Sequence, residues 1–215
     1  MRKILVLMTS FLFLTFGAQA GVNIGISGIY LDIDTDGTET LKQNSVKTSK
    51  THSETAAVGE IFIEAVNDSG IAFGVAVIPG EAELGSNSTT RTDKLTSGTS
   101  TVTQKAQAEI SGHTTVYALF PVINENLYLK VGAGSVDVET NETLGTGAAY
   151  GNQSVNFATL SLGLQRDLGG LFMRAEIGHT DYEEVHLKST SSDAVSDIRG
   201  DISHTHGKIS VGKSF

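Results

Sequence analysis

The sequence predicts an all-β protein, an eight-stranded antiparallel up-and-down transmembrane β-barrel. Three observations favour this fold class. First, the chain beyond residue 20 has no segment long and apolar enough for a transmembrane helix, and only two prolines interrupt a sequence rich in Thr, Val and Gly, a composition typical of strands. Second, bulky apolar residues alternate with Gly, Ala and charged residues. Third, short turns alternate with long polar stretches, which is the layout of barrels that span lipid.

The segment of residues 60–79 shows the second observation most clearly, because it reads as a hairpin. A tight turn at residues 67–70 joins its arms with Asn, Asp, Ser and Gly, which are all typical turn residues. On the return arm the bulky side chains share one face, and Gly and Ala occupy the other. On the outgoing arm Glu60 and Glu64 fall on the face of the small side chains. Charges thus lie where a soluble sheet would bury its core, which is the inverted pattern of a barrel in lipid.

Residues 1–20 have the pattern of a cleaved secretory signal peptide. A positively charged start is followed by a 13-residue apolar core at residues 4–16 and by a small-residue cleavage pattern that ends at Ala20. The alternative, an N-terminal membrane anchor, would need roughly 20 apolar residues. We therefore expect a mature chain of residues 21–215 that forms a single barrel domain.

Charge and cysteine content narrow the function classes. The chain has 15 basic and 24 acidic residues and a formal net charge of −9; removing Arg2 and Lys3 leaves 13 against 24, a charge of −11. Such an acidic chain is not expected to bind nucleic acid. It contains no cysteine, so no disulfide framework can stabilise it after export. A closed hydrogen-bonded cylinder would supply that stability, and no cofactor is expected.

Taken in order, the chain gives eight strands. In the first, the apolar alternation changes phase near Gly28, so that Ile29, Leu31 and Ile33 take the other face, and we expect a β-bulge there. The other strands keep one period-two pattern. The eight are expected near residues 22–33, 60–66, 71–77, 106–120, 127–134, 158–165, 171–178 and 208–215.

The connections between these strands alternate in length. Short turns are centred near residues 68, 124 and 168. The long polar stretches are residues 34–56, 81–105, 137–154 and 183–200. Short turns at one end and long loops at the other are typical of an up-and-down barrel whose loops face outward.

Seven charged residues are predicted to point into the barrel. A one-residue slip of register would turn them toward lipid, at roughly 2 to 4 kcal/mol for each Arg or Lys near the midplane, so the register is well specified. Eight strands leave an interior just wide enough for side chains to fill. We interpret the seven as a buried polar network that plugs the lumen; the alternative is a gated polar pore. The seven are Glu60, Glu64, Glu109, Lys130, Arg174, Glu176 and Lys208.

One acidic motif raises the question of calcium. Asp32, Asp34 and Asp36, followed by Gly37, match the first half of a calcium loop. However, Gln43 stands where the bidentate Glu of such a loop is expected. We interpret the motif as a solvated acidic turn, with calcium binding as the alternative.

The histidines raise the question of metal binding or catalysis. His204 and His206 share one face of the last strand, but the spacing fixes no third metal ligand. Ser203 beside His204 is the nearest candidate for a histidine-activated serine, although adjacent strand residues point to opposite faces. We expect neither a metal site nor a catalytic site.

With its signal peptide, eight alternating strands and C-terminal Ile209, Val211 and Phe215, the chain resembles the OmpA/OmpX-type family of small outer-membrane β-barrel proteins. The resemblance implies that these three residues form an assembly signal read by the barrel-assembly machinery, although Lys213 stands where an apolar residue is usual. It also implies export to the cell outer membrane, contact with its lipids and lipopolysaccharide, and a barrel without a peptidoglycan-binding domain. Tyr30, Phe120, Phe157 and Phe172 are the expected aromatic girdle.

The predicted function follows from this reading. We expect a monomeric, non-enzymatic outer-membrane protein of a Gram-negative-type envelope. Its four long extracellular loops would give it a structural or surface-interaction role, in adhesion or envelope integrity, with an external surface or a host ligand as partner. Two alternatives stay open: a narrow porin-like channel for small solutes, and a lipid A-modifying enzyme.

Overall fold

The computed structural model describes residues 21–41, 47–95, 98–123, 126–144, 149–189 and 196–215. The predicted signal peptide, residues 1–20, lies outside them. Within these ranges no helix is long and apolar enough to cross a membrane. The described residues form strands joined by turns and short irregular segments.

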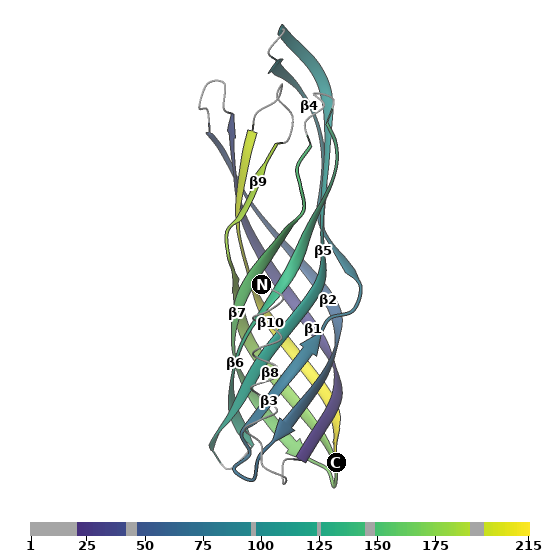
Figure 1. Ribbon diagram of the computed structural model, residues 1–215, viewed down its shortest axis with the longest axis vertical. Coiled ribbons are helices and arrows are strands. Elements are labelled where there is room, and N and C mark those ends of the chain that lie inside the picture. The colour runs from purple at the N-terminus through teal and green to yellow at the C-terminus, as the bar shows by residue number, and fades with distance from the viewer. Residues whose placement is uncertain (1–20, 42–46, 96–97, 124–125, 145–148, 190–195) are drawn as a thin grey trace.

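Eight strands close into an antiparallel ring in the order β1-β2-β3-β5-β6-β7-β8-β10, and β10 pairs with β1 to complete it (Figure 1). Two further strands extend the wall at one end, where β4 pairs with β5 and β9 pairs with β10. The prediction of an eight-stranded up-and-down barrel is therefore confirmed. The strands are β1 (Gly21–Leu41), β2 (Lys47–Val66), β3 (Ala72–Val77), β4 (Glu81–Leu95), β5 (Gly98–Ile123), β6 (Leu127–Leu144), β7 (Gln153–Asp167), β8 (Leu171–Tyr182), β9 (Val185–Lys188) and β10 (Ser196–Ser214).

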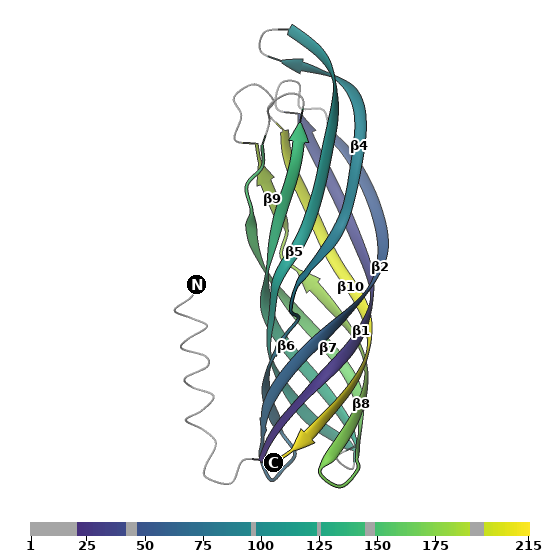
Figure 2. The same ribbon diagram turned by 90° about the vertical axis from the view of Figure 1, so that its right-hand side faces the viewer.

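Much of the long polar stretches forms β-ribbons that continue the barrel strands. Thr90 bonds Thr103 at 3.0 Å and Thr92 bonds Thr101 at 2.7 Å across the β4–β5 ribbon, and such cross-strand hydroxyl pairs stabilise a ladder. β-Branched threonine also favours strands over loops. The ribbons rise from one end of the barrel, and β4 and β5 reach farthest (Figure 2).

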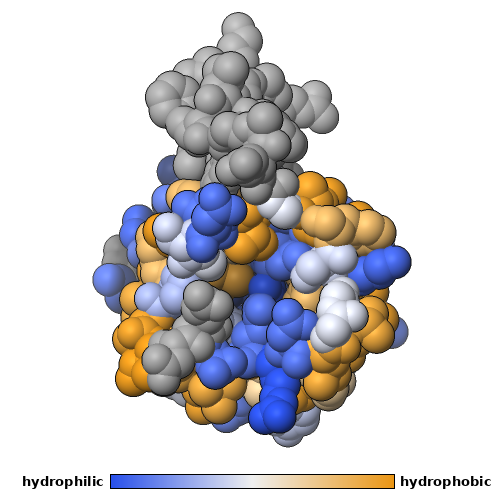
Figure 3. All heavy atoms as spheres, turned by 90° about the horizontal axis from the view of Figure 1, so that it is seen from below, coloured by the Kyte–Doolittle hydropathy of each residue, from blue (hydrophilic) through white to orange (hydrophobic). Residues whose placement is uncertain are grey.

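The outer surface of the ring carries an apolar band. On β1 it runs from Val22, 37% exposed, to Tyr30, 59% exposed. Nine residues of strand are about 30 Å long, and at the usual tilt of about 40° they rise about 23 Å, close to the roughly 25 Å of an outer-membrane barrel. Seen from the short-turn end, apolar residues form much of the rim around a hydrophilic centre (Figure 3). Further exposed members are Ile24, Ile26, Ile61, Ile63, Leu160, Leu162, Leu164, Leu171, Met173, Ile177, Ile209 and Val211.

The bulge expected at Gly28 does not form. β1 pairs with β2 and with β10 without any register shift along its length, so the strict alternation continues past Gly28. What changes is polarity: Ile29, Leu31 and Ile33 line the interior, while Asp32 on the other face is exposed. The sequence pattern reverses because the apolar band ends here.

A bulge does occur in β5. The ladder with β6 pairs Ser111 with Asp137 and Thr114 with Ser135, so β5 contains one extra residue. Gly112 lies there with φ of +64°, a left-handed conformation that glycine adopts without strain. An extra residue reverses which face each earlier side chain takes. The single alternation predicted over residues 106–120 is therefore wrong above the bulge.

Large aromatic rings fill the narrow interior by lying over glycines. Five such pairs stand directly opposite each other in the ladder: Gly25 with Phe62, Gly74 with Tyr117, Gly134 with Phe157, Gly163 with Tyr128 and Gly212 with Phe172. In each pair, a Cβ on the glycine would lie 2.2 to 2.5 Å from a ring carbon. The strand faces that carry small residues thus leave the space that the rings occupy inside the barrel.

This packing corrects the predicted aromatic girdle. Phe157 and Phe172 are 5% and 1% exposed and belong to the interior, whereas Tyr30 and Phe120 lie on the outer surface. The reason is the glycine opposite each buried ring, which leaves room for it inside the barrel.

The glycine and ring pairs predict the result of one substitution. In Gly74→Ala the new Cβ would lie 2.4 Å from Cζ of Tyr117, whose hydroxyl is held by Glu64. We expect a loss of about 1 to 3 kcal/mol in the free energy of unfolding, measured by urea titration in lipid vesicles with heat-modifiable gel mobility as the readout. Gly207→Ala is the control, since no atom lies within 4 Å of its Cβ position. Equal losses in both variants would contradict this account of the packing.

Candidate functional site

The interior contains two layers of charge near the short-turn end. In the first layer, Glu64 is 2% exposed and pairs with both terminal nitrogens of Arg174, one of them at 2.9 Å. Asn23 and the Tyr117 hydroxyl each donate a further hydrogen bond to Glu64 at 2.9 Å. The Arg174 Nε donates to Gln165 at 2.7 Å. Residues from five strands thus meet at one carboxylate and its guanidinium partner.

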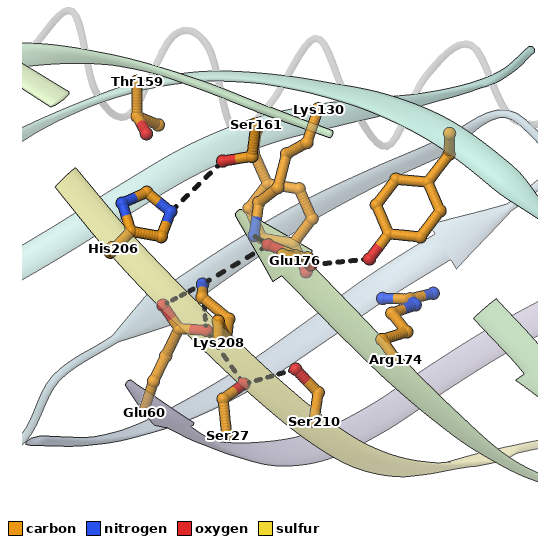
Figure 4. Close-up of polar contacts among 12 residues, drawn as sticks. Ser27, Glu60, Lys130, Thr159, Ser161, Arg174, Glu176, His206, Lys208 and Ser210 are labelled. Carbon is orange, nitrogen blue, oxygen red and sulfur yellow. Dashed lines mark hydrogen bonds and ion pairs between the residues drawn. The ribbon is translucent and has the colours of Figure 1, made fainter. Parts of the chain in front are cut away.

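The second layer is centred on Lys208. Its Nζ donates to both carboxylate oxygens of Glu60 at 2.8 and 3.0 Å and lies 3.8 Å from Glu176. Glu176 also accepts hydrogen bonds from Lys130 at 3.3 Å and from the Tyr128 hydroxyl at 2.8 Å. Figure 4 shows this layer, with Lys208 between the two carboxylates.

Aromatic rings lie against one cation of each layer. The Arg174 guanidinium carbon lies 4.5 Å from the ring centre of Phe172 and 5.6 Å from that of Tyr128. The Lys130 nitrogen lies 4.2 Å from the ring centre of Tyr117. Cation–π contacts of this kind strengthen when water is excluded. The rings therefore help to stabilise the charges of the two layers.

Together the layers form a plug, which we define as Glu60, Glu64, Lys130, Arg174, Glu176 and Lys208. Three acids face three bases, and every member is at most 7% exposed. The structure thus brings together six of the seven residues predicted to face the interior. Glu109 is the exception: it lies beyond the β5 bulge, opposite Glu139, and accepts a hydrogen bond from Gln107.

Above the plug the interior opens into a cavity of about 120 Å³, which we call the pocket. Its floor is polar and includes Lys208, Lys130 and Ser161. Thr180 and Thr159, which bond each other at 2.9 Å, also line it. The wall above is mainly apolar and includes Ile29, Leu31, Ile33, Val58, Ile78, Ile110, Phe157 and Ile202. A mostly apolar cavity with a few polar groups is the usual form of a small-molecule site.

The barrel wall is broken beside the pocket. Pairing between β2 and β3 ends at Ile61 and Val77, and above that level β4 pairs with β5, while β2 pairs with β1. Pro79 has no backbone N–H to continue the ladder, and Gly80 follows with φ of +94°. Residues 78–81 and the facing part of β2, including Val58, both line the pocket. The break between β2 and β4 therefore borders the pocket.

The acidic motif has no calcium-loop geometry. Asp32, Asp34 and Asp36 lie on one exposed face of β1, where alternate residues are about 6.6 Å apart along the strand. Asp36 accepts a hydrogen bond from Thr51 and Asp34 from Ser53, both at 2.6 Å. A straight strand cannot wrap these carboxylates around one ion, and within the described ranges no group of three or more metal-ligating side chains is found.

The structure also places the histidine and serine candidates on different faces of the barrel wall. His204 is buried, and its Nδ1 lies 3.2 Å from the Tyr182 hydroxyl. Ser203 lies on the opposite face of β10 and cannot be activated by His204. His179 is exposed on the outer face and contacts Asp181 at 3.3 Å, away from the interior His206.

The C-terminal residues lie on the outer surface at the short-turn end. Ile209, Val211 and Phe215 are 56%, 45% and 69% exposed, and the Lys213 nitrogen lies 4.7 Å from the Phe215 ring centre. They face outward in the apolar band, where the predicted assembly signal would be accessible. That role stays a prediction.

The pocket was not predicted from the sequence. Its signal was present in β1, where Ile29, Leu31 and Ile33 change phase, but a bulge explained the same pattern. A shift of apolar residues from the outer to the inner face, without a bulge, marks where an apolar interior begins.

Comparison with known proteins identifies the fold. No protein-family model and no curated protein matches the chain. The crystal structure of the outer-membrane protein OprG from Pseudomonas aeruginosa aligns with a TM-score of 0.54 and 9% identity, over 91% of this chain and 96% of that one. The solid-state NMR structure of the outer-membrane protein AlkL in lipid bilayers aligns with a TM-score of 0.54 and 12% identity, over 92% and 90%. Both are eight-stranded outer-membrane barrels. The OmpA/OmpX-type likeness stays a prediction.

The plug predicts a strong effect of removing one partner. Arg174→Met leaves Glu64 buried without its cation, and we expect a loss of about 3 to 5 kcal/mol in the free energy of unfolding. Adding Glu64→Gln should restore most of it, because the neutral amide no longer needs a counter-charge. Urea titration in lipid vesicles gives both values.

The control for this prediction is Arg199→Met. Its ion pair with Glu184, at 2.8 Å, is about half exposed on both sides, so its loss should cost roughly 0 to 1 kcal/mol. A double variant no more stable than Arg174→Met alone would show that the unpaired charge is not the cause.

Proposed function

We propose that this protein is an outer-membrane barrel that takes a small, mostly apolar molecule into the pocket and exchanges it with the surrounding lipid through the break between β2 and β4. The observation that carries the proposal is a cavity of about 120 Å³ whose lining includes both edges of the break, Val58 of β2 and residues 78–81. In this proposal the short turns face the periplasm, and the ribbons rise above the lipopolysaccharide leaflet.

The plug supports a lateral route over a pore through the barrel axis. A separate cavity of about 340 Å³ lies at the short-turn end and is lined by Asn23, Asp68 and Arg174, among others. Arg174 and Glu64 stand between this cavity and the second layer of the plug. Opening an axial path would break buried ion pairs, each of which is costly to separate. The narrow-channel alternative is therefore less favoured than lateral exchange.

The position of the pocket supports the same route. Its lower residues lie level with the upper part of the outward apolar band, since Glu60 stands opposite Ser27 in the ladder and Ile29 opposite Val58. An apolar molecule held at this level lies beside the hydrocarbon of the outer leaflet. Leaving through the wall would spare it contact with water.

The ribbons are the basis of the expected surface-interaction role. Many of their polar groups bond each other: Thr51 donates to Asp36, Ser53 donates to Asp34, and Thr90 bonds Thr103. Groups that satisfy each other across a ladder offer less to an external partner. The proposed function is therefore based on the pocket and not on the ribbons.

We expect the plug to prevent ion conduction through the barrel. In planar lipid bilayers at neutral pH we expect no steady ion current through the wild-type protein, because the six plug residues and their rings fill the axis. A porin measured in the same bilayer serves as the positive control. Steady single-channel conductance would contradict the plugged interior and would favour the porin-like alternative.

The break in the wall predicts that joining its sides stops transfer. In the variant Val58→Cys with Glu81→Cys, a short bis-maleimide would join two residues that line the pocket from β2 and β4. We expect cross-linking to abolish the protein-dependent uptake of radiolabelled benzene by cells with a lipopolysaccharide outer leaflet, relative to the same variant treated with N-ethylmaleimide, which modifies both cysteines without joining β2 to β4.

The matched control for the cross-link is Thr90→Cys with Thr103→Cys, two residues that pair in the ribbon away from the pocket. Their cross-linking should leave uptake unchanged. Uptake that survives the Val58 and Glu81 cross-link would exclude the lateral route.

A further inference from the structure

Five aromatic rings follow one another along one side of the pocket. The His113 ring stacks on Phe157 with centres 4.4 Å apart and planes 23° apart. Phe157 lies 5.3 Å from Tyr182, Tyr182 lies 5.7 Å from His204, and His204 lies 5.3 Å from His206. These rings come from β5, β7, β8 and β10, and all five line the pocket. We call them the ring arc.

The other side of the pocket is aliphatic. It is formed mainly by Ile29, Leu31 and Ile33 of β1, by Val58 of β2 and by Ile78. A pocket with rings on one side and branched aliphatic groups on the other suits a flat molecule, because rings prefer offset-stacked or edge-to-face contact with other rings.

The size of the pocket suits a single ring. Its volume is about 120 Å³, and an engineered cavity of about 150 Å³ in another protein holds benzene. A single six-membered ring therefore matches the volume of the pocket.

Two ring nitrogens of the arc, His113 Nδ1 and His206 Nδ1, are closed to solvent and have no hydrogen-bond partner among the described residues, so a ligand reaches either one only when that imidazole ring turns toward the pocket. The other nitrogen of His206 lies 3.2 Å from the Ser161 hydroxyl (Figure 4), and His206 as a whole is 6% exposed. A buried polar atom without a partner costs free energy that a ligand can recover. A hydroxyl group can donate to or accept from either form of an imidazole nitrogen.

The charges around the pocket favour an uncharged ligand. Lys208 is bonded by Glu60, and Lys130 is bonded by Glu176. Both cations at the pocket floor therefore already have carboxylate partners. A ligand carboxylate would be desolvated without gaining a counter-charge.

We propose that the ligand of the pocket is a single-ring aromatic molecule with one uncharged hydrogen-bonding substituent, of which phenol is the simplest case. Its ring packs against Phe157 and Tyr182, and its hydroxyl bonds a ring nitrogen at one end of the arc, on His206 or His113. This inference rests on the proposed function and names its substrate class.

The test is a titration of four compounds of similar size: phenol, toluene, cyclohexanol and benzoate. The full barrel is placed in lipid nanodiscs at neutral pH with ¹³C-labelled isoleucine methyl groups. Ile29, Ile33, Ile78, Ile110 and Ile202 line the pocket and report binding. Ile24, Ile26, Ile63 and Ile177 face outward and report simple dissolution in lipid. Free ligand concentrations are corrected for partition into the lipid.

We expect saturable shifts of the pocket isoleucines with phenol, at an affinity about tenfold higher than for toluene or cyclohexanol, and none with benzoate. Similar affinities for phenol, toluene and cyclohexanol, or tighter binding of benzoate, would overturn the inference and leave the proposed function intact. No saturable shift with any of the four would overturn both.

Three variants test whether the arc recognises the ligand. Phe157→Leu should reduce the advantage of phenol over cyclohexanol to about twofold. His206→Phe with Ser161→Ala, or His113→Phe, keeps the ring arc and removes a nitrogen, so one of these two variants should lose the advantage of phenol over toluene. If both histidine variants still bind phenol more tightly than toluene, the proposed hydrogen bond to a ring nitrogen is wrong.

The control variant is Phe120→Leu, whose ring lies on the outer surface, and all four affinities should stay unchanged in it. Heat-modifiable gel mobility shows whether each variant is folded. If the arc variants do not fold, the four-compound titration of the wild-type protein decides the inference alone.

Discussion

The closure of eight strands into one ring constrains everything inside it, because the interior is only as wide as the side chains that fill it. Two pairings meet this constraint. Rings lie over glycines, as Tyr117 does over Gly74, and carboxylates meet cations, as Glu64 meets Arg174. Neither pairing works alone, since Tyr117 packs on Gly74 and also donates a hydrogen bond to Glu64. Packing and charge balance therefore depend on the same side chains.

The polarity of the interior also changes at the level where the outer apolar band ends. Below Tyr30 the outer face is apolar and the interior charged, while above it β1 presents Asp32 outward and Ile33 inward. Lipid forces apolar side chains to the outside of the lower barrel, so the polar residues must satisfy each other within. Water outside the upper barrel restores the usual arrangement of a soluble barrel. The pocket lies where these two regimes meet, with the plug as its floor and an aliphatic wall above.

Much of this architecture could be predicted from the sequence, because the period-two alternation directly encodes which face each side chain takes. Six of the seven predicted interior charges lie in the plug, and the eight strands are correct. Glu109 was misplaced because a single extra residue at Gly112 reverses the faces, and a Gly in a strand carries no mark of its backbone conformation. The reversal after Gly28 was read as a bulge because both give the same pattern in one strand. The ring arc could not be predicted, since it joins four strands whose relative stagger only the closed ring defines.

If the proposed function is correct, the direction of exchange follows from the plug and from the free energy of transfer. A molecule in the pocket can move upward into water or sideways into lipid, because the plug closes the third path. At about 0.8 kcal/mol for each CH₂-sized group, a six-carbon ring is favoured in hydrocarbon over water by roughly 4 to 5 kcal/mol, which is on the order of a thousandfold. A hydroxyl group without a partner costs about 4 to 8 kcal/mol in pure hydrocarbon, so the preference holds for an apolar ring and not for a ligand whose hydroxyl enters hydrocarbon unpaired. Under the proposed function, the break where the β2–β3 ladder ends gives an apolar ligand the favoured way out, and the plug below the pocket makes the exchange one-sided.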